Sequence, residues 1–111
     1  MSASFEIKLN EKKQFYFQYL NKQHELMMMS REYDDKTSAE QAIKDVRVGS
    51  LMGEQLAAGK VSNGDSFFVV KNTAGDILAK SILFNSQMVF DNAFHAMRDN
   101  ACMAEIRDLT A

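Results

Sequence analysis

Few residues of this sequence have the types and spacing that catalysis requires. His24 and His95 stand far apart in the chain, so a shared zinc or acid–base site would need the fold to bring them together. Cys102, the single cysteine, follows His95 by seven residues, which along a helix is about 10 Å and too far for a nucleophile–base hydrogen bond. We interpret the histidines as unrelated surface residues and Cys102 as a small, half-buried thiol.

Two other clusters have simpler structural explanations. Glu32, Asp34 and Asp35 could be catalytic or metal-binding carboxylates, but they directly precede an expected helix, whose N-terminus favours negative charge. The methionine run at 27–29 could bind a soft metal, yet consecutive residues on a strand alternate between faces and cannot converge on one ion. Phosphate-loop and Cys-x-x-Cys patterns do not occur. We therefore predict no catalytic residue, no metal site, no cofactor and no enzymatic activity.

Composition narrows the class of protein further. The 111 residues include 13 basic and 15 acidic side chains, and a net charge of −2 does not favour nucleic acid or an anionic membrane as partner. The hydrophobic fraction of 46% is enough for a core. One cysteine excludes an internal disulfide and fits a reducing compartment. Because the sequence shows neither a signal-peptide pattern nor an 18-residue apolar run, we expect a cytoplasmic protein without a membrane partner.

The two halves of the chain match each other when shifted by 51 positions. The identical pairs are Phe17 with Phe68, Asn21 with Asn72, Ser30 with Ser81, Ala42 with Ala93, and Arg47 with Arg98. We predict a single domain, residues 1–111, made of two pseudo-repeats at about 5–50 and 54–101, followed by a C-terminal tail at 102–111.

Each copy reads as three strands followed by a helix. In the first copy, residues 5–9 alternate between apolar and polar, residues 15–20 are rich in aromatics, and residues 25–29 form a third short apolar run. Such short connections predict an antiparallel meander. The matching first strand of the second copy, at 54–60, alternates poorly and could extend the preceding helix; the repeat favours a strand.

The helices show a different period. Thr37 begins a capping-box sequence in which its hydroxyl could accept a hydrogen bond from the Glu40 amide, and Gly49 marks a plausible end. Asn85 or Ser86 is the expected cap in the second copy. The expected buried faces are Ala39, Ala42, Ile43 and Val46 in the first helix, and Phe90, Ala93, Phe94 and Met97 in the second.

These patterns resemble the YegP-like family of small, mostly bacterial proteins, many of which carry two tandem copies of one unit. The residues that carry the resemblance are Phe5-Glu6-Ile7, Phe17-Gln18-Tyr19, Ser30-Arg31-Glu32-Tyr33, Asn63-Gly64, Gly75-Asp76 and Asp108-Leu109-Thr110. The sequence departs from the family where Gln23-His24 replaces the usual Asn-Gly, and where Phe84 replaces a tyrosine. The resemblance implies an α+β fold in which tandem β-β-β-α units share an antiparallel sheet of up to six strands, with both helices on one face. It implies no activity.

The opposite face of this expected sheet is our candidate binding surface. If the helices cover Phe17, Tyr19, Met27, Phe68, Val70 and Leu78, the alternation of strand residues leaves the other face open. That face would carry Tyr16, Phe67, Lys8 and Val69, together with Glu6. Aromatic and basic residues there could stack nucleotide bases, but a protein contact, such as a homodimer made face to face or edge to edge, fits the charge better.

The function we favour is a non-enzymatic binding or assembly module that acts through a sheet face or edge. The alternatives are an accessory protein for single-stranded nucleic acid and a small enzyme with an unrecognised site. No small-molecule partner is indicated. Because the second half is less charged and most apolar around Met88–Met97, we expect a partner surface to lie in that half.

Overall fold

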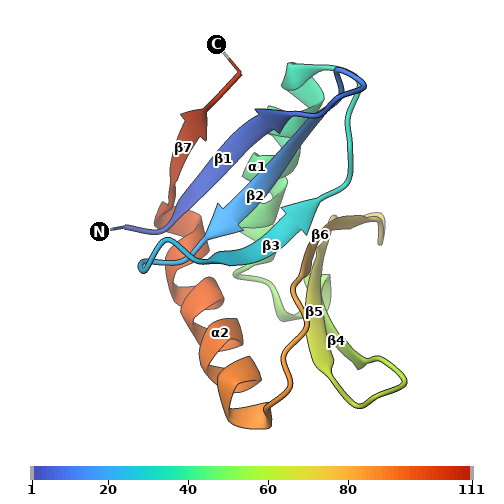
Figure 1. Cartoon of the computed structure of the whole chain (residues 1–111), viewed down its shortest axis with the longest axis vertical. Helices are drawn as coiled ribbons and strands as arrows, with labels where there is room; N and C mark the ends of the chain where they lie inside the picture. Colours follow the sequence, from blue (N-terminus) through green and yellow to red (C-terminus); the bar gives the residue numbers. More distant parts are fainter. Residues whose placement is uncertain (1, 111) are drawn as a thin grey trace.

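The structure, a computed structural model, describes residues 2–110, which form one mixed sheet and two α-helices (Figure 1). The strands are β1 (Ser4–Leu9), β2 (Phe15–Leu20), β3 (Leu26–Ser30), β4 (Leu56–Lys60), β5 (Ser66–Lys71), β6 (Ile77–Ser81) and β7 (Glu105–Asp108). The helices are α1 (Lys36–Gly49) and α2 (Gln87–Asn100), with short 3-10 turns η1 (Gly53–Gln55) and η2 (Ala101–Met103). The α+β class is confirmed, and so is the strand interpretation of 54–60, since β4 occupies most of that segment.

The sheet has seven strands in the order β4-β5-β6-β3-β2-β1-β7. Neighbouring strands are antiparallel except β1 and β7, which are parallel. The prediction of an antiparallel sheet with up to six strands is therefore wrong, because part of the expected C-terminal tail forms β7. Its four residues are all exposed and offer no long apolar pattern that sequence reasoning could recognise.

Contacts with distant parts of the chain hold β7 in place. The Lys36 ammonium lies 2.7 Å from the Asp108 carboxylate, and the Leu109 amide donates to the Ile7 carbonyl. The Arg47 guanidinium donates to the Ala104 carbonyl just before the strand. Hydrogen bonds from Lys36 and then Thr110 lower the pKa of Asp108 to about 2, so this carboxylate stays ionised at neutral pH.

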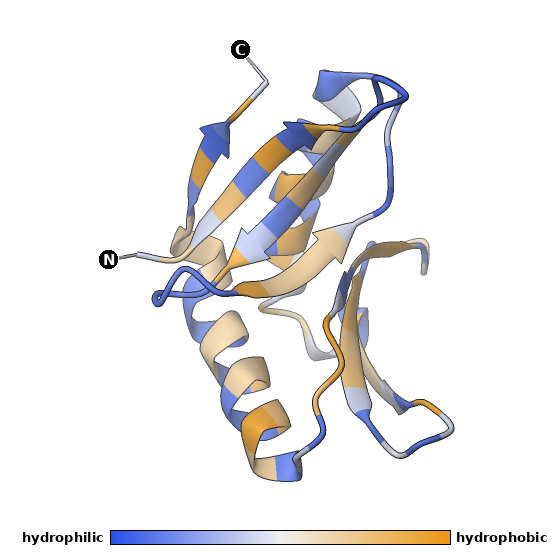
Figure 2. Cartoon of the chain, viewed as in Figure 1, coloured by the Kyte–Doolittle hydropathy of each residue, from blue (hydrophilic) through white to orange (hydrophobic). Residues whose placement is uncertain are grey.

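One core lies between the helices and a single face of the sheet. Phe5, Ile7, Phe17 and Tyr19 come from the β1–β2 hairpin and pack with buried residues of β5, β6, α1 and α2. Met28, fully buried, pairs with Tyr19, and the expected core residue Met27 is partly buried and packs against the same core. Met28 joins Met27 there because a β-bulge after Tyr19 shifts the register by one residue. Apolar and polar residues alternate along β1 and β2, as Figure 2 shows, because only one face of these strands packs on the core.

The cap of α1 differs from the one that the sequence predicts, whereas the cap of α2 is one of the two expected residues. Asp35, not Thr37, caps α1: its carboxylate accepts from the Ser38 amide at 2.7 Å, and this bond lowers the Asp35 pKa. Ser86 caps α2, as one of the two expected candidates. All four residues of the predicted α1 face are buried, whereas the α2 face is buried at Phe90 and Met97 and half-buried between them. Within residues 2–110, neither helix combines the length and the apolar character needed to cross a membrane.

Local geometry recurs at positions 51 residues apart. The Ser30 hydroxyl accepts from the Phe17 amide at 2.9 Å, and Ser81 accepts from Phe68 at the same distance. The β-bulges after Tyr19 and Val70 also correspond. Two tight turns match as well: the positive φ angles of 62° at Lys13 and 64° at His24 correspond to glycines at positions 64 and 75.

Replacing His24 with glycine is expected to raise the free energy of unfolding by about 0.5–1 kcal/mol, because a side chain in the left-handed region is strained and glycine is not. Urea denaturation followed by circular dichroism measures the change. The reciprocal variant Gly75→His, at the matching turn, serves as control and should lower stability by about 1 kcal/mol. Loss of stability in His24→Gly would contradict the strain argument.

Candidate binding site

The residues predicted to form a surface on the open sheet face do not form one continuous patch. Lys8 and Tyr16 are cross-strand partners at one end of the sheet, and both are half-exposed. Phe67 lies on β5, three strand spacings and several residues away, on the order of 20 Å from Tyr16. Its ring carries the Lys80 ammonium 4.5 Å from the ring centroid. Tyr16 and Phe67 are therefore too far apart to belong to one aromatic surface.

Val69 is the member of the predicted surface that the structure contradicts. It is only 5% exposed, because it lies between Ala57 on β4 and Lys80 on β6 and is shielded by its neighbours. Glu6 on the same face is also buried, at 7% exposure, beside the Lys8 ammonium. Tyr16, Lys8 and Phe67 remain accessible, but Val69 cannot contribute much contact area.

The candidates for chemistry stay dispersed. His24 lies in the β2–β3 turn and His95 on the exposed side of α2. Cys102 is half-buried in η2. Asp35 is a helix cap. Among residues 2–110, no three His, Cys, Asp or Glu side chains group closely enough to hold a metal ion.

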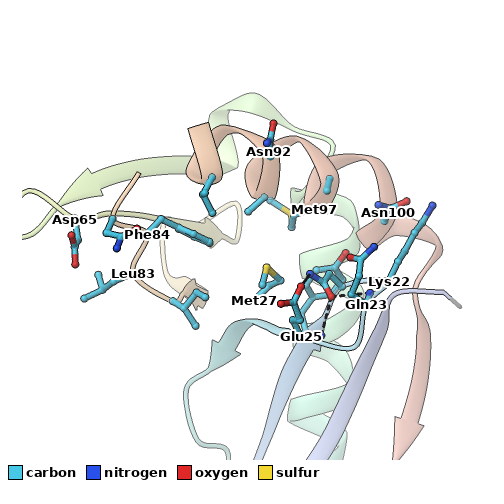
Figure 3. Close-up of a pocket in the computed structure, with 17 residues that line it drawn as sticks. Lys22, Gln23, Glu25, Met27, Asp65, Leu83, Phe84, Asn92, Met97 and Asn100 are labelled. Carbon is cyan, nitrogen blue, oxygen red and sulfur yellow. Dashed lines mark hydrogen bonds between the residues drawn. The ribbon is translucent and has the colours of Figure 1, made fainter. Parts of the chain in front are cut away.

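A cleft lies between α2 and the β2–β3 hairpin and has a volume of about 680 Å³ (Figure 3). This size is typical of ligand sites. Met27 and Met97 meet in its middle, Lys22, Gln23 and Asn100 lie at one end, and Leu83, Phe84 and Asp65 lie at the other. The remaining lining residues are Tyr19, Asn21, Glu25, Ile82, Asn85, Val89, Asn92, Ala93 and Ala96.

The cleft exists because the two helices pack differently against the sheet. Gly49 ends α1 and lies so close to β5 that an added Cβ would come within 3.0 Å of the Val70 side chain and 3.2 Å of the Lys71 carbonyl. At the positions 51 residues away, α2 ends with Asn100 and β2 carries Tyr19. Both are larger than their counterparts Gly49 and Val70. Tyr19 and Asn100 both line the cleft that separates α2 from the hairpin.

The floor of the cleft is apolar and adaptable. Met27 and Met97 have flexible thioether side chains, which can repack around ligands of different shape. Apolar surface continues out of the cleft along its open side, where Leu83 is 48% exposed and Val89 is 51% exposed, and Met88 beside it is 73% exposed. Figure 2 shows this apolar run in the segment before α2 and in the first turn of the helix.

The rim carries amide groups and little charge. Asn85, Asn92 and Asn100 are among the lining residues, and a side-chain amide can both donate and accept hydrogen bonds. Among the described residues that line the cleft, Lys22 is the only cation, and Glu25 and Asp65 are acidic. This balance favours an uncharged ligand over a phosphate-bearing one. Burial, with a smaller contribution from Cys102, raises the pKa of Tyr19 to about 12, so its hydroxyl stays neutral.

Asn21 shapes the hairpin side of the cleft. Its carboxamide oxygen accepts from the Gln23 amide at 3.0 Å and from the Glu25 amide at 2.8 Å, which fixes the turn. Sequence reasoning missed the cleft because its residues come from three separate segments. The one signal that pointed toward it was the apolar stretch Met88–Met97, which supplies the α2 wall.

This small α+β architecture, with a mixed sheet and an open helix–hairpin cleft, has known relatives. No family model matches the chain. The UPF0339 protein of Pseudomonas aeruginosa is 32% identical over 87 residues, covering 78% of this chain and 79% of the relative. The UPF0339 protein YegP of Escherichia coli K12 is 26% identical over 110 residues, covering 99% and 100%. The chain belongs to the UPF0339 family of YegP-like proteins, as its sequence resemblance predicted.

Solved structures share the fold. The solution NMR structure of the UPF0339 protein from Shewanella oneidensis superposes with a TM-score of 0.91 at 24% identity, covering 98% of this chain and 92% of that one. The solution NMR structure of YegP from E. coli gives a TM-score of 0.90 at 26% identity, covering 98% and 94%. The E. coli protein is described as having unknown function, and no specific activity follows from these relatives.

Proposed function

We propose that this chain is a non-enzymatic binding module whose cleft between α2 and the β2–β3 hairpin holds a mostly apolar, uncharged segment of a partner polypeptide. The observation that carries the proposal is an apolar floor with an amide rim that continues into exposed Leu83, Val89 and Met88. These exposed apolar side chains add contact area outside the cleft, which suits the spaced apolar side chains of a peptide. The weak and net acidic charge of the rim argues against nucleic acid.

Two further proposals accompany this one. The recurrence of hydrogen bonds, bulges and turns at 51-residue spacing supports an origin as two tandem β-β-β-α units. In the first unit the helix packs closely on the sheet, and in the second a cleft lies beside the helix. A single free, half-buried cysteine supports a reducing, cytoplasmic location.

Selection of a displayed library of 12-residue peptides on the purified protein tests the proposed function. Enriched peptides are expected to carry two or more large apolar residues and to bind the Ala96→Glu variant about tenfold or more weakly, since Ala96 lines the cleft and a glutamate there adds bulk and a charge at the contact. His95→Glu is the matched control, because His95 is the exposed neighbour on α2 that does not line the cleft.

The Tyr16→Asp variant probes the alternative surface on the sheet. Binding that survives this change but not Ala96→Glu supports the cleft. If every enriched peptide binds Ala96→Glu as strongly as the original protein, or is lost only in Tyr16→Asp, the cleft is not the binding site.

A further inference from the structure

The two halves of the sheet differ in whether an added strand covers their outer hairpin. At one edge, β7 runs parallel to β1, with Phe5 opposite Ile106 and Ile7 opposite Asp108. At the other edge lies β4, which pairs with β5 alone among the described strands. Because β1 and β4 correspond at 51-residue spacing, β7 shows how an extended segment can dock on this type of edge.

The backbone groups of β4 are oriented to receive such a segment. The Val61 amide donates to the Asp65 carbonyl, and in an antiparallel pair such bonded positions alternate with outward-facing ones. Because Val61 faces β5, the N–H and C=O groups of Ala58 and Lys60 face away from β5. The Leu56 carbonyl faces away as well. The Leu56 amide already donates to Gly53 in η1. The positions that match Ala58 and Leu56 on the other edge are Ile7 and Phe5.

A small pocket of about 200 Å³ lies next to this edge, lined by Ala58, Gly59, Lys60, Ser66, Gln87 and Phe90. Two matching positions on the other edge carry larger side chains: Ile7 stands for Ala58 and Phe15 for Ser66. A void of about 150 Å³ can hold a benzene-sized group, so the pocket has room for one large side chain.

We propose that β4 accepts an extended segment of a partner polypeptide as an added parallel strand, with one large apolar side chain of that segment in the pocket beside Phe90. Main-chain hydrogen bonds to Ala58 and Lys60 supply the pairing, as in other cases of strand addition. The site is separate from the cleft.

The contacts of β7 also indicate the chemistry of the added strand. Asp108 of β7 pairs with Lys36, the first residue of α1. The matching first residue of α2 is Gln87, which lines the pocket and is uncharged. The added strand is therefore expected to carry an uncharged side chain where β7 carries Asp108, and apolar residues two positions apart on the helix-facing side.

Peptide selection on the Ala96→Glu protein, in which the cleft is blocked, isolates the edge. Enriched peptides should bind Ala58→Pro about tenfold or more weakly, because proline removes an outward-facing N–H without removing a bond to β5. Ser66→Phe is a second variant, in which phenylalanine, the residue at the matching position 15, occupies part of the pocket. It should also weaken binding. Retained binding to the correctly folded Ala58→Pro and Ser66→Phe proteins would overturn the proposal.

The pairing itself has a distinctive signature. Peptides with a single N-methylated residue should lose binding when that residue's amide faces β4, and should keep it when the amide faces away. The sensitive positions should therefore alternate along the peptide. A nitroxide label at the N-terminus of the peptide should broaden the amide signals near Leu56 more than those near Lys60. The opposite order would contradict parallel docking. A dimer of the original chain that Ala58→Pro dissociates would overturn the proposal by identifying a second copy as the occupant.

Discussion

Replacing Phe68 with alanine is expected to lower the free energy of unfolding by about 3–5 kcal/mol. The side chain is fully buried, and its ring centroid lies 6.1 Å from Phe84, 6.0 Å from Phe90 and 5.3 Å from Phe94. Truncation would remove the centre of this aromatic cluster and leave a cavity that β5 and α2 cannot close without moving.

Urea denaturation followed by circular dichroism measures this effect. Phe67→Ala is the matched control, since the neighbouring ring is half-exposed on the opposite face of the sheet and packs over Gly59. We expect a loss of about 1 kcal/mol there. Equal losses in the two variants would mean that the assignment of sheet faces is wrong.

Replacing Gly49 with asparagine, the residue at the matching end of α2, is expected to lower the free energy of unfolding by about 2–3 kcal/mol. Even the first carbon of a side chain would lie 3.0 Å from both the Val70 side chain and the Gln55 amide nitrogen, and 3.2 Å from the Lys71 carbonyl. Backbone at β5 cannot yield easily, so α1 must shift away from the sheet.

The reciprocal test is Asn100→Ala, at the half-exposed end of α2 beside the cleft. Its effect on stability is expected to stay within about 0.5 kcal/mol, because the cleft leaves room on that side. Thermal and urea denaturation of the two variants, measured side by side, give the comparison. Similar losses at both positions would contradict the view that one helix is closed on the sheet and the other is held open.

Regular periodicity made much of the fold predictable from the sequence. The alternation around Phe5 and Ile7 and the helical spacing of Ala39, Ile43 and Val46 each correspond to a buried face in the structure. Features set by a single interaction were not predictable. The β-bulge that brings Met28 into the core has no local signature.

Long-range contacts explain the other differences. β7 is too short and polar to be recognised, and it forms because Lys36 and Arg47 on α1 bind its flanks. Val69 looked like a surface residue by alternation alone, yet the flanking strands shield it. The cleft is lined by residues from separate segments of the chain, which come together only once both helices are placed on the sheet.

NMR titration of the isotope-labelled protein with a peptide enriched in the selection tests directly whether the cleft binds the peptide. The largest chemical-shift changes are expected on the cleft, at the amides of Val89, Ala93, Ala96 and Met97 and at the methyl group of Met27. Changes concentrated instead on Lys8, Tyr16 and Met29, on the opposite face of the sheet, would contradict binding in the cleft.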